Sequence, residues 1–175
     1  MLIKWLSTRI MPLYRFESDA MSSPTVVSHR VQAITRVAPS TWGSIKESFG
    51  VRENTTASFI GIVEDNTFRL RRDIRYRNSF LPQIRGMVSE APSGSRILVT
   101  MHIHPFAVVF MCFWLCGAGA GALTMFSNSA SGSVFSSLIP VGMFVIGIAL
   151  TLIGFYPEAY KARRLIEGAI RRNNA

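Results

Sequence analysis

The interval from Pro105 to Pro157 contains no Lys, Arg, Asp, Glu or His, although the chain has nineteen basic and ten acidic residues. Inside it, residues 105–126 and 138–156 each supply the ~20 apolar residues that cross a ~30 Å hydrocarbon core as a helix. A small, polar, Ser-rich loop joins the two segments. Because a helix satisfies its own backbone groups in lipid, the sequence predicts a transmembrane helical hairpin. A soluble chain of 175 residues has too little mass to bury two such helices on all sides.

Basic residues lie before the first apolar segment and after the second one. Five of the nineteen follow the second segment and the others precede the first, whereas the loop has none. Because Lys and Arg are in excess on the cytoplasmic side of membrane proteins, we expect both chain ends to be cytoplasmic, in a multi-pass membrane protein.

Residues 1–12 mix apolar side chains with Lys4 and Arg9, which interrupt the apolar run that a signal peptide needs. We expect either a short interfacial segment at the membrane surface or an irregular start of the chain.

Residues 13–104 show the patterns of a small α+β domain with a mainly antiparallel sheet. Residues 13–20 alternate as a strand does. Pro24 opens a helical pattern that runs to about residue 36, with Ser23 as its N-cap. The stretch 39–50 is ambiguous between a turn and a short strand.

Two β-hairpins are predicted in the second half of this domain. Residues 57–73 alternate around a turn at 65–66, and residues 83–104 alternate around a turn at 92–94. The last strand has one apolar and one polar face and runs straight into the first apolar segment. After the second segment, residues 157–175 are predicted to form a short, basic cytoplasmic helix.

The segment 69–86 concentrates arginines next to the predicted hairpin, with Asp73 as the one acid among them. Contact with anionic lipid headgroups is one interpretation, since each Lys or Arg near such a surface contributes ~1 kcal/mol. An anionic ligand or partner is another, and nucleic acid, which the net charge of +9 also allows, is the least favoured. The candidate contact residues are Arg69, Arg71, Arg72, Arg75, Arg77 and Arg85.

The sequence YRNSFLP at 76–82 interrupts the strand pattern and predicts a shaped loop. Its Asn and Ser side chains can bond to local backbone groups and set a turn, while neighbouring arginines can hold a phosphate or carboxylate bidentately. Both a ligand-binding loop and a turn that places aromatic and apolar side chains in the core fit this pattern. The candidate residues are Tyr76, Asn78, Ser79, Phe80 and Pro82.

His102 and His104 precede the hairpin at strand spacing. Such a pair points to one side of a strand and resembles two metal ligands, but a site needs a third ligand. His29 is the only other histidine. We therefore expect interfacial histidines, with no metal and no other cofactor.

Small residues form the sequence GAGAG at 117–121. Such a face lets helices approach closely, either within the chain or between copies of a homo-oligomer. Cys112 and Cys116 in the same segment are expected to be packing residues. The candidate helix-packing glycines are Gly117, Gly121, Gly147 and Gly154.

Catalytic motifs are not evident in the sequence. Glycine-rich phosphate loops, zinc-protease helices and nucleophile elbows do not occur. The predicted spans contain no Lys, Arg, Asp, Glu or His with which to line an ion path. An enzyme and a selective transporter are therefore both disfavoured.

The order of these pieces resembles a group of small, uncharacterised bacterial membrane proteins. They share an F-x-G-x-V strand, a Y-R-N-S-F-L-P loop, an I-x-G strand and an H-P-F junction into a hydrophobic hairpin. Residues 57–115 carry the resemblance, which implies a widespread bacterial module without an assigned activity. The layout is also similar, as a fold, to membrane proteins of the YcxB type, although the order differs because here the spans follow the sheet.

Two functions are predicted from these features. The first is an inner-membrane protein whose cytoplasmic domain is a binding or regulatory module, with the lipid bilayer as its partner and its basic loop on anionic lipid or an anionic ligand. The second is a membrane effector, or an immunity-type protein, that oligomerises through the small-residue face.

Overall fold

A computed structural model of the chain describes residues 14–37, 57–127 and 134–171, with side chains in the last range from residue 138 onward. The interfacial segment expected at 1–12, the ambiguous stretch 39–50 and the centre of the Ser-rich loop lie outside the described residues.

The described residues contain a six-stranded sheet with the strand order β1-β6-β5-β4-β3-β2. Neighbouring strands pair antiparallel, except that β2 and β3 are parallel. The predicted α+β class with a mainly antiparallel sheet is confirmed, and both predicted hairpins are present. The strands are β1 (Tyr14–Ala20), β2 (Thr35–Val37), β3 (Phe59–Glu64), β4 (Thr67–Arg72), β5 (Gln83–Ala91) and β6 (Gly94–His102).

Alternation along the strands separates an inner face from an outer face. In β6, Ile97, Val99 and Met101 are fully buried, whereas Arg96, which precedes them, is exposed. Gly94 closes the tight turn from β5 with a φ of 135°, a conformation that residues with a side chain rarely adopt.

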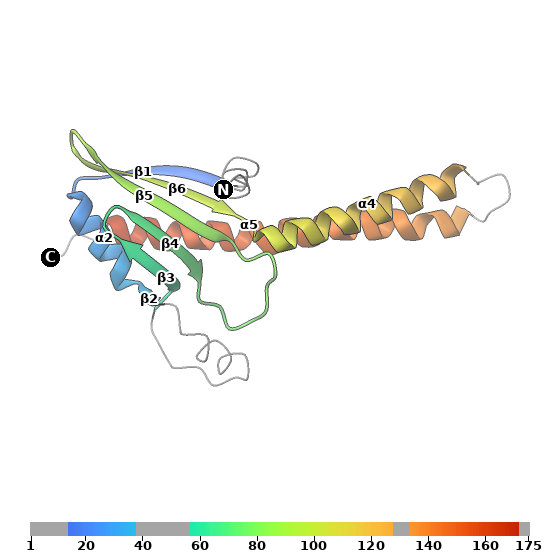
Figure 1. Cartoon of the computed structure of the whole chain (residues 1–175), viewed down its shortest axis with the longest axis horizontal. Helices are drawn as coiled ribbons and strands as arrows, with labels where there is room; N and C mark the ends of the chain where they lie inside the picture. Colours follow the sequence, from blue (N-terminus) through green and yellow to red (C-terminus); the bar gives the residue numbers. More distant parts are fainter. Residues whose placement is uncertain (1–13, 38–56, 128–133, 172–175) are drawn as a thin grey trace.

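Two helices cover the inner face of the sheet (Figure 1). Val27 and Val31 of α2 (Pro24–Ala33) and Ile166 of α5 (Val134–Arg171) belong to the same buried cluster as the inward side chains of the strands. α2 ends earlier than the sequence predicts, because residues 35–37 pair with β3 as strand β2. We call the sheet, α2 and the C-terminal half of α5 the sheet domain.

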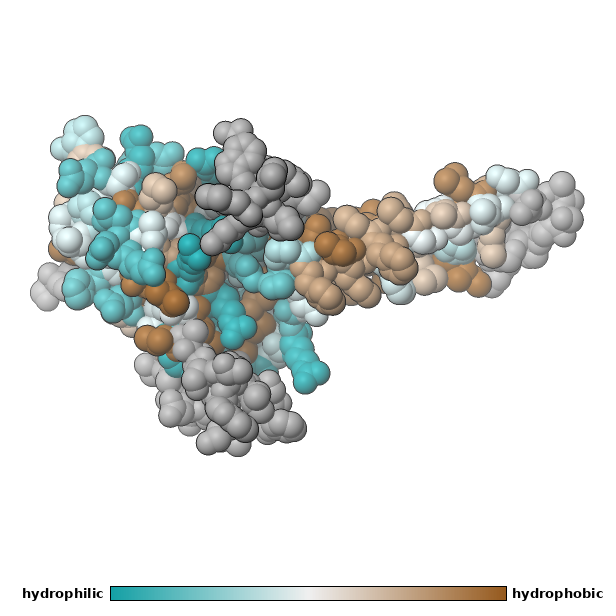
Figure 2. Space-filling model, viewed as in Figure 1, coloured by the Kyte–Doolittle hydropathy of each residue, from teal (hydrophilic) through white to brown (hydrophobic). Residues whose placement is uncertain are grey.

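The apolar hairpin extends from one end of the sheet domain (Figure 1). It consists of α4 (Pro105–Ser127) and the N-terminal half of α5, and both helices are long and apolar enough to cross a membrane. Figure 2 shows apolar side chains gathered on the hairpin beside a sheet domain whose surface is largely hydrophilic. Phe113 and Ile153 are 81% and 70% exposed, and a continuous apolar surface of this kind indicates a membrane or partner-contacting region.

One helix replaces the two that the sequence predicts at the C-terminal end. α5 passes through Pro157 without a break, so residues 157–171 continue the second apolar helix instead of forming a separate short one. A proline inside a helix removes a backbone hydrogen bond and crowds the preceding turn. Phe155, Ala159 and Ala162 are buried against the sheet on either side of Pro157, and this packing holds the helix together.

Candidate functional site

Arginines cross the outer face of the sheet in register. Arg15 of β1 lies opposite Thr100 of β6, Thr100 lies opposite Arg85 of β5, and Arg85 lies opposite Arg69 of β4. Side chains that face each other in this way have Cβ atoms ~4.5–5.5 Å apart, and like charges at this distance destabilise a sheet. The Arg69–Arg85 pair therefore favours a nearby anion.

Most acids of the sheet lie at the other end of the strands from these arginines, while Asp73, which follows β4, pairs with Arg36. Among the residues that the structure describes, Arg15, Arg69, Arg71 and Arg85 make no ion pair. Glu17 and Asp19 are farther from the hairpin and pair with Arg96. Three further acids lie in or beside the turns at that end, namely Glu64 at the end of β3, Asp65 in the turn and Glu90 in β5.

The outer face is therefore polarised along the strands. β6 leads into α4, so the end of the sheet with the unpaired arginines is the end next to the hairpin. Three of these arginines, Arg69, Arg71 and Arg85, line a shallow groove of about 350 Å³ together with Gln83. We call Arg15, Arg69, Arg71 and Arg85 the arginine row.

The loop between β4 and β5 packs against α5. The Asn78 side chain donates a hydrogen bond to the Gly154 carbonyl at 2.7 Å, and its own oxygen accepts one from the Phe80 amide at 2.9 Å. A Cβ at Gly154 would lie 2.9 Å from Cδ2 of Phe80. The absence of a side chain at Gly154 thus allows the loop to reach the helix backbone, one turn before Pro157.

A buried carboxylate fixes the same loop from the other side. Glu158 is 3% exposed and accepts hydrogen bonds from the Arg72 guanidinium, the Tyr76 hydroxyl and Lys161. The hydrogen bond to this carboxylate is the main cause that raises the pKa of Tyr76 above its ordinary value. Arg72 is therefore occupied within the protein, whereas the neighbouring arginines of the candidate set are not.

Arg163 joins α5 to the opposite edge of the sheet. Its guanidinium donates to the Tyr14 hydroxyl at 2.8 Å, lies 5.2 Å from the centre of the Phe16 ring and pairs with Glu167 at 2.7 Å. The basic residues of this half of α5 thus include one that binds the sheet rather than solvent.

The two histidines before the hairpin do not form a pair on one strand. β6 ends at His102, which is buried, while the exposed His104 accepts a hydrogen bond from the Phe106 amide at 3.2 Å at the start of α4. Burial is the main cause that lowers the pKa of His102, followed by the positive charge of Arg85. No cluster of three or more His, Cys, Asp or Glu occurs within the described ranges.

The candidate glycines have different neighbours. Gly147 faces Trp114 and Leu115, and Gly121 faces Pro140, so both lie between α4 and α5. Gly117 meets nothing within 4 Å, and Gly154 contacts the loop instead of α4. Cys112 and Cys116, expected to pack, are both exposed on α4.

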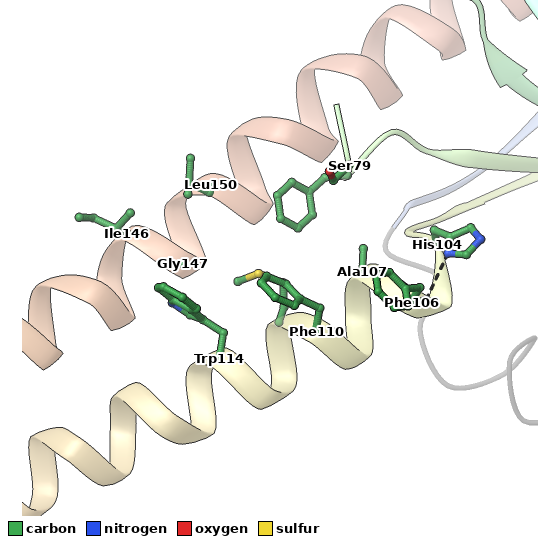
Figure 3. A pocket seen from close by; sticks show the side chains of 11 residues that line it. Ser79, His104, Phe106, Ala107, Phe110, Trp114, Ile146, Gly147 and Leu150 are labelled. Atoms are coloured by element: carbon green, nitrogen blue, oxygen red, sulfur yellow. Dashed lines mark hydrogen bonds between the residues drawn. The ribbon is translucent and has the colours of Figure 1, made fainter. Parts of the chain in front are cut away.

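A cavity of about 680 Å³ lies where α4 and α5 meet the loop. Figure 3 shows Phe106, Phe110 and Trp114 of α4 on one side, Ile146 and Leu150 of α5 on the other, and Ser79 and His104 at the end next to the sheet domain. Its walls are apolar, and Ser79 and His104 supply the polar groups at one end.

Sequence reasoning identified the loop and most of the arginines but missed Glu158. The structure places Arg75, Arg77 and Ser79 at exposed positions of the loop and buries Pro82. Arg15 was also missed, because nothing in the sequence shows that β1 pairs with β6. Glu158 did carry a signal, since it is the first charge after the long uncharged interval and follows a proline.

These features define a class of protein: a sheet domain with a polarised basic face, joined by one continuous helix to an apolar hairpin of membrane-spanning length. No protein family, no curated protein and no solved structure was found to match this chain.

Proposed function

We propose that this chain is a bacterial inner-membrane protein whose cytoplasmic sheet domain is a binding module for anionic phospholipid headgroups. The observation that carries the proposal is the arginine row, which lies in register on the hairpin side of the sheet and lacks acidic partners among the described residues. The acids at the far end of the strands give the domain the charge polarity that an anionic surface would orient.

The distances fit such a contact. Thr100, in the middle of the arginine row, precedes Pro105 by five residues, a length of ~16 Å at ~3.3 Å per residue. The headgroup layer on one side of the hydrocarbon core is ~5–7 Å thick and accounts for part of this length. The remaining gap is comparable to the ~8 Å Debye length at physiological salt, and an arginine side chain shortens it.

Arg71 and the loop residues Arg75 and Arg77 extend the basic surface toward the hairpin. All three are exposed, and the loop is held in place by Asn78 and Glu158. Each basic residue near an anionic surface contributes ~1 kcal/mol, so several together are expected to bias the tilt of the domain.

The test uses the full chain in nanodiscs of phosphatidylcholine alone or mixed with phosphatidylglycerol. Hydrogen exchange of the loop 73–82 should slow with phosphatidylglycerol at low salt and return to its original rate at high salt. Arg69→Gln with Arg71→Gln and Arg85→Gln should abolish the effect. Exchange that is equal in both lipids would contradict the proposal.

Arg96→Gln is the matched control. It removes the same kind of charge from the same face, but Arg96 lies at the far end and pairs with Glu17 at 2.8 Å, so lipid-dependent protection should persist. Adding inorganic phosphate to phosphatidylcholine nanodiscs tests a free anion, which would protect the loop without any anionic lipid.

A homo-oligomeric membrane effector or immunity-type protein is the second candidate. Gly117 favours it, because this glycine has no neighbour within 4 Å while Gly121 already packs on Pro140. Crosslinking in membranes should give ladders that Gly117→Ile removes. A protein that stays monomeric at high density in the membrane would exclude this function.

A further inference from the structure

The cavity between α4 and α5 has a shape set by the loop. Phe80 lines it and also lines a second, smaller cavity of about 200 Å³ that shares Ala107 and Met111. Farther along the hairpin, Gly147 contacts Trp114 and Leu115 directly. The helices are therefore close together at Gly147 and leave space on both sides of Phe80.

The larger cavity opens to the surroundings of the hairpin. Phe106, Phe110, Ile146 and Leu150 line it and are 75%, 53%, 58% and 57% exposed. From Phe106 to Trp114 it extends for ~12 Å along α4 at 1.5 Å per residue. This length is close to the ~15 Å thickness of one leaflet of the hydrocarbon core.

One end of this cavity is polar and adjoins an exposed arginine. His104 and Ser79 lie at the end next to the sheet domain. Arg77 is exposed and only two residues from Ser79, which places their Cα atoms within ~8 Å. An apolar cavity with a few polar groups at one end is typical of sites for amphipathic small molecules.

We propose that this cavity binds an acyl chain of one anionic phospholipid, whose phosphate lies against Ser79 and His104 beside Arg77. The inference rests on the membrane insertion and orientation of the proposed function and adds a defined lipid site. A helix of a second copy fits less well, because bulky aromatic residues line the cavity, whereas helix–helix interfaces in membranes favour small ones.

The smaller cavity provides an internal comparison. Its lining includes Cys112, Thr151 and Leu152 but neither Ser79 nor His104. Both cavities would be exposed to the same lipid. If only the larger cavity prefers an anionic headgroup, the polar end that the smaller cavity lacks is the cause of the preference.

The experiment follows quenching of Trp114 in the full chain carrying Trp5→Phe and Trp42→Phe, reconstituted with phospholipids that have brominated acyl chains. Brominated phosphatidylglycerol should associate about fivefold more strongly than brominated phosphatidylcholine, the effect of roughly one basic contact. Arg77→Gln with His104→Asn should abolish this preference, since it removes the guanidinium and the imidazole while the asparagine side chain keeps an acceptor for the Phe106 amide.

Leu150→Phe, which narrows the larger cavity, should reduce the preference, whereas Leu152→Phe in the smaller one should leave it unchanged. Equal quenching by the two lipids, or equal effects of the two Phe variants, would overturn the proposal. If Trp114 is protected from quenching by both lipids and this protection grows with the protein-to-lipid ratio, a second copy of the chain occupies the cavity. That result would also overturn the proposal.

The outcomes are separable from those of the proposed function. Quenching by both lipids without preference still reports insertion into the bilayer. Arg69→Gln with Arg85→Gln should reduce loop protection in the exchange experiment while leaving the quenching preference intact.

Discussion

The two halves of α5 differ in how far their apolar side chains are exposed. The half in the hairpin leaves large apolar residues such as Ile146 and Ile153 exposed, whereas the half in the sheet domain buries Ala159, Ala162 and Ile166 completely. In the first half the exposed apolar surface belongs to a helix that is long and apolar enough to cross a membrane. In the second half alanines let the helix lie close to the sheet, so one helix is adapted to two environments.

The largest effect is expected at the boundary between these halves. Glu158→Ala should destabilise the sheet domain by about 3–5 kcal/mol, because it leaves Arg72 without its carboxylate in a partly buried site. Thermal unfolding of the full chain in detergent, followed by circular dichroism, measures the loss.

Glu167→Ala is the control for this prediction. Its partner Arg163 has a side chain that is 41% exposed, so the loss should be no more than about 1 kcal/mol. Equal losses for the two variants would show that burial of Glu158 does not matter.

Matched Ile→Ala substitutions should affect the stability of the protein differently in the two halves of α5. Ile166→Ala is expected to cost about 2–4 kcal/mol, since Ile166 is fully buried and the change leaves a cavity. Ile153→Ala removes the same atoms from a residue that is 70% exposed and should change the unfolding temperature in detergent little. Similar shifts of the unfolding temperature for the two variants would contradict the difference in burial between the halves.

The contact between loop and helix predicts a smaller effect at Gly154. Gly154→Ala should cost about 1–3 kcal/mol by overpacking, since the new methyl group would lie 2.9 Å from Phe80 and 3.2 Å from Asn78. Gly142→Ala meets nothing within 4 Å and should be neutral or stabilising by up to about 1 kcal/mol. The measurement is the unfolding temperature, together with hydrogen exchange of the loop, which should rise only in Gly154→Ala.

Acid should weaken the sheet domain but not the hairpin. The pKa of His102 is lowered in the folded protein by burial, Arg85 and His104, so the unfolded chain binds the proton more readily. Stability is then fully present above the ordinary histidine pKa of about 6.5 and falls as the pH drops below it. Unfolding temperatures between pH 8 and pH 5 measure this slope.

His102→Gln should flatten that slope. The helicity of the hairpin should not respond, because the interval from Pro105 to Pro157 has no ionisable side chain of the five types Lys, Arg, Asp, Glu and His. A slope that is unchanged in the variant would assign the pH dependence to other groups.

Local patterns predicted much of the fold. Alternation in β6 and the turn at Gly94 predicted the β5–β6 hairpin, and the uncharged interval predicted the apolar helices. Strand pairing between β1 and β6 was not predictable, since no local pattern links segments about eighty residues apart. Arg15 entered the arginine row only through that pairing.

The candidate site was likewise predictable from the sequence only in part. The loop composition predicted a shaped turn, but its partner on α5 is a glycine that the sequence suggested for packing against α4. Arg72 and Arg71 are adjacent in the chain, yet one binds Glu158 and the other faces outward, because neighbouring residues of a strand point to opposite faces.

By itself the sequence determined that the chain has two segments long and apolar enough to span a membrane, since the absence of charge over more than twice the length of a membrane span is a property of composition alone. Only the tertiary structure decided that α5 continues through Pro157. The proline favours a break locally, but packing of Phe155, Ala159 and Ala162 on the sheet outweighs the lost hydrogen bond. Burial depends on which residues lie opposite in space, and the neighbours along the chain do not determine these.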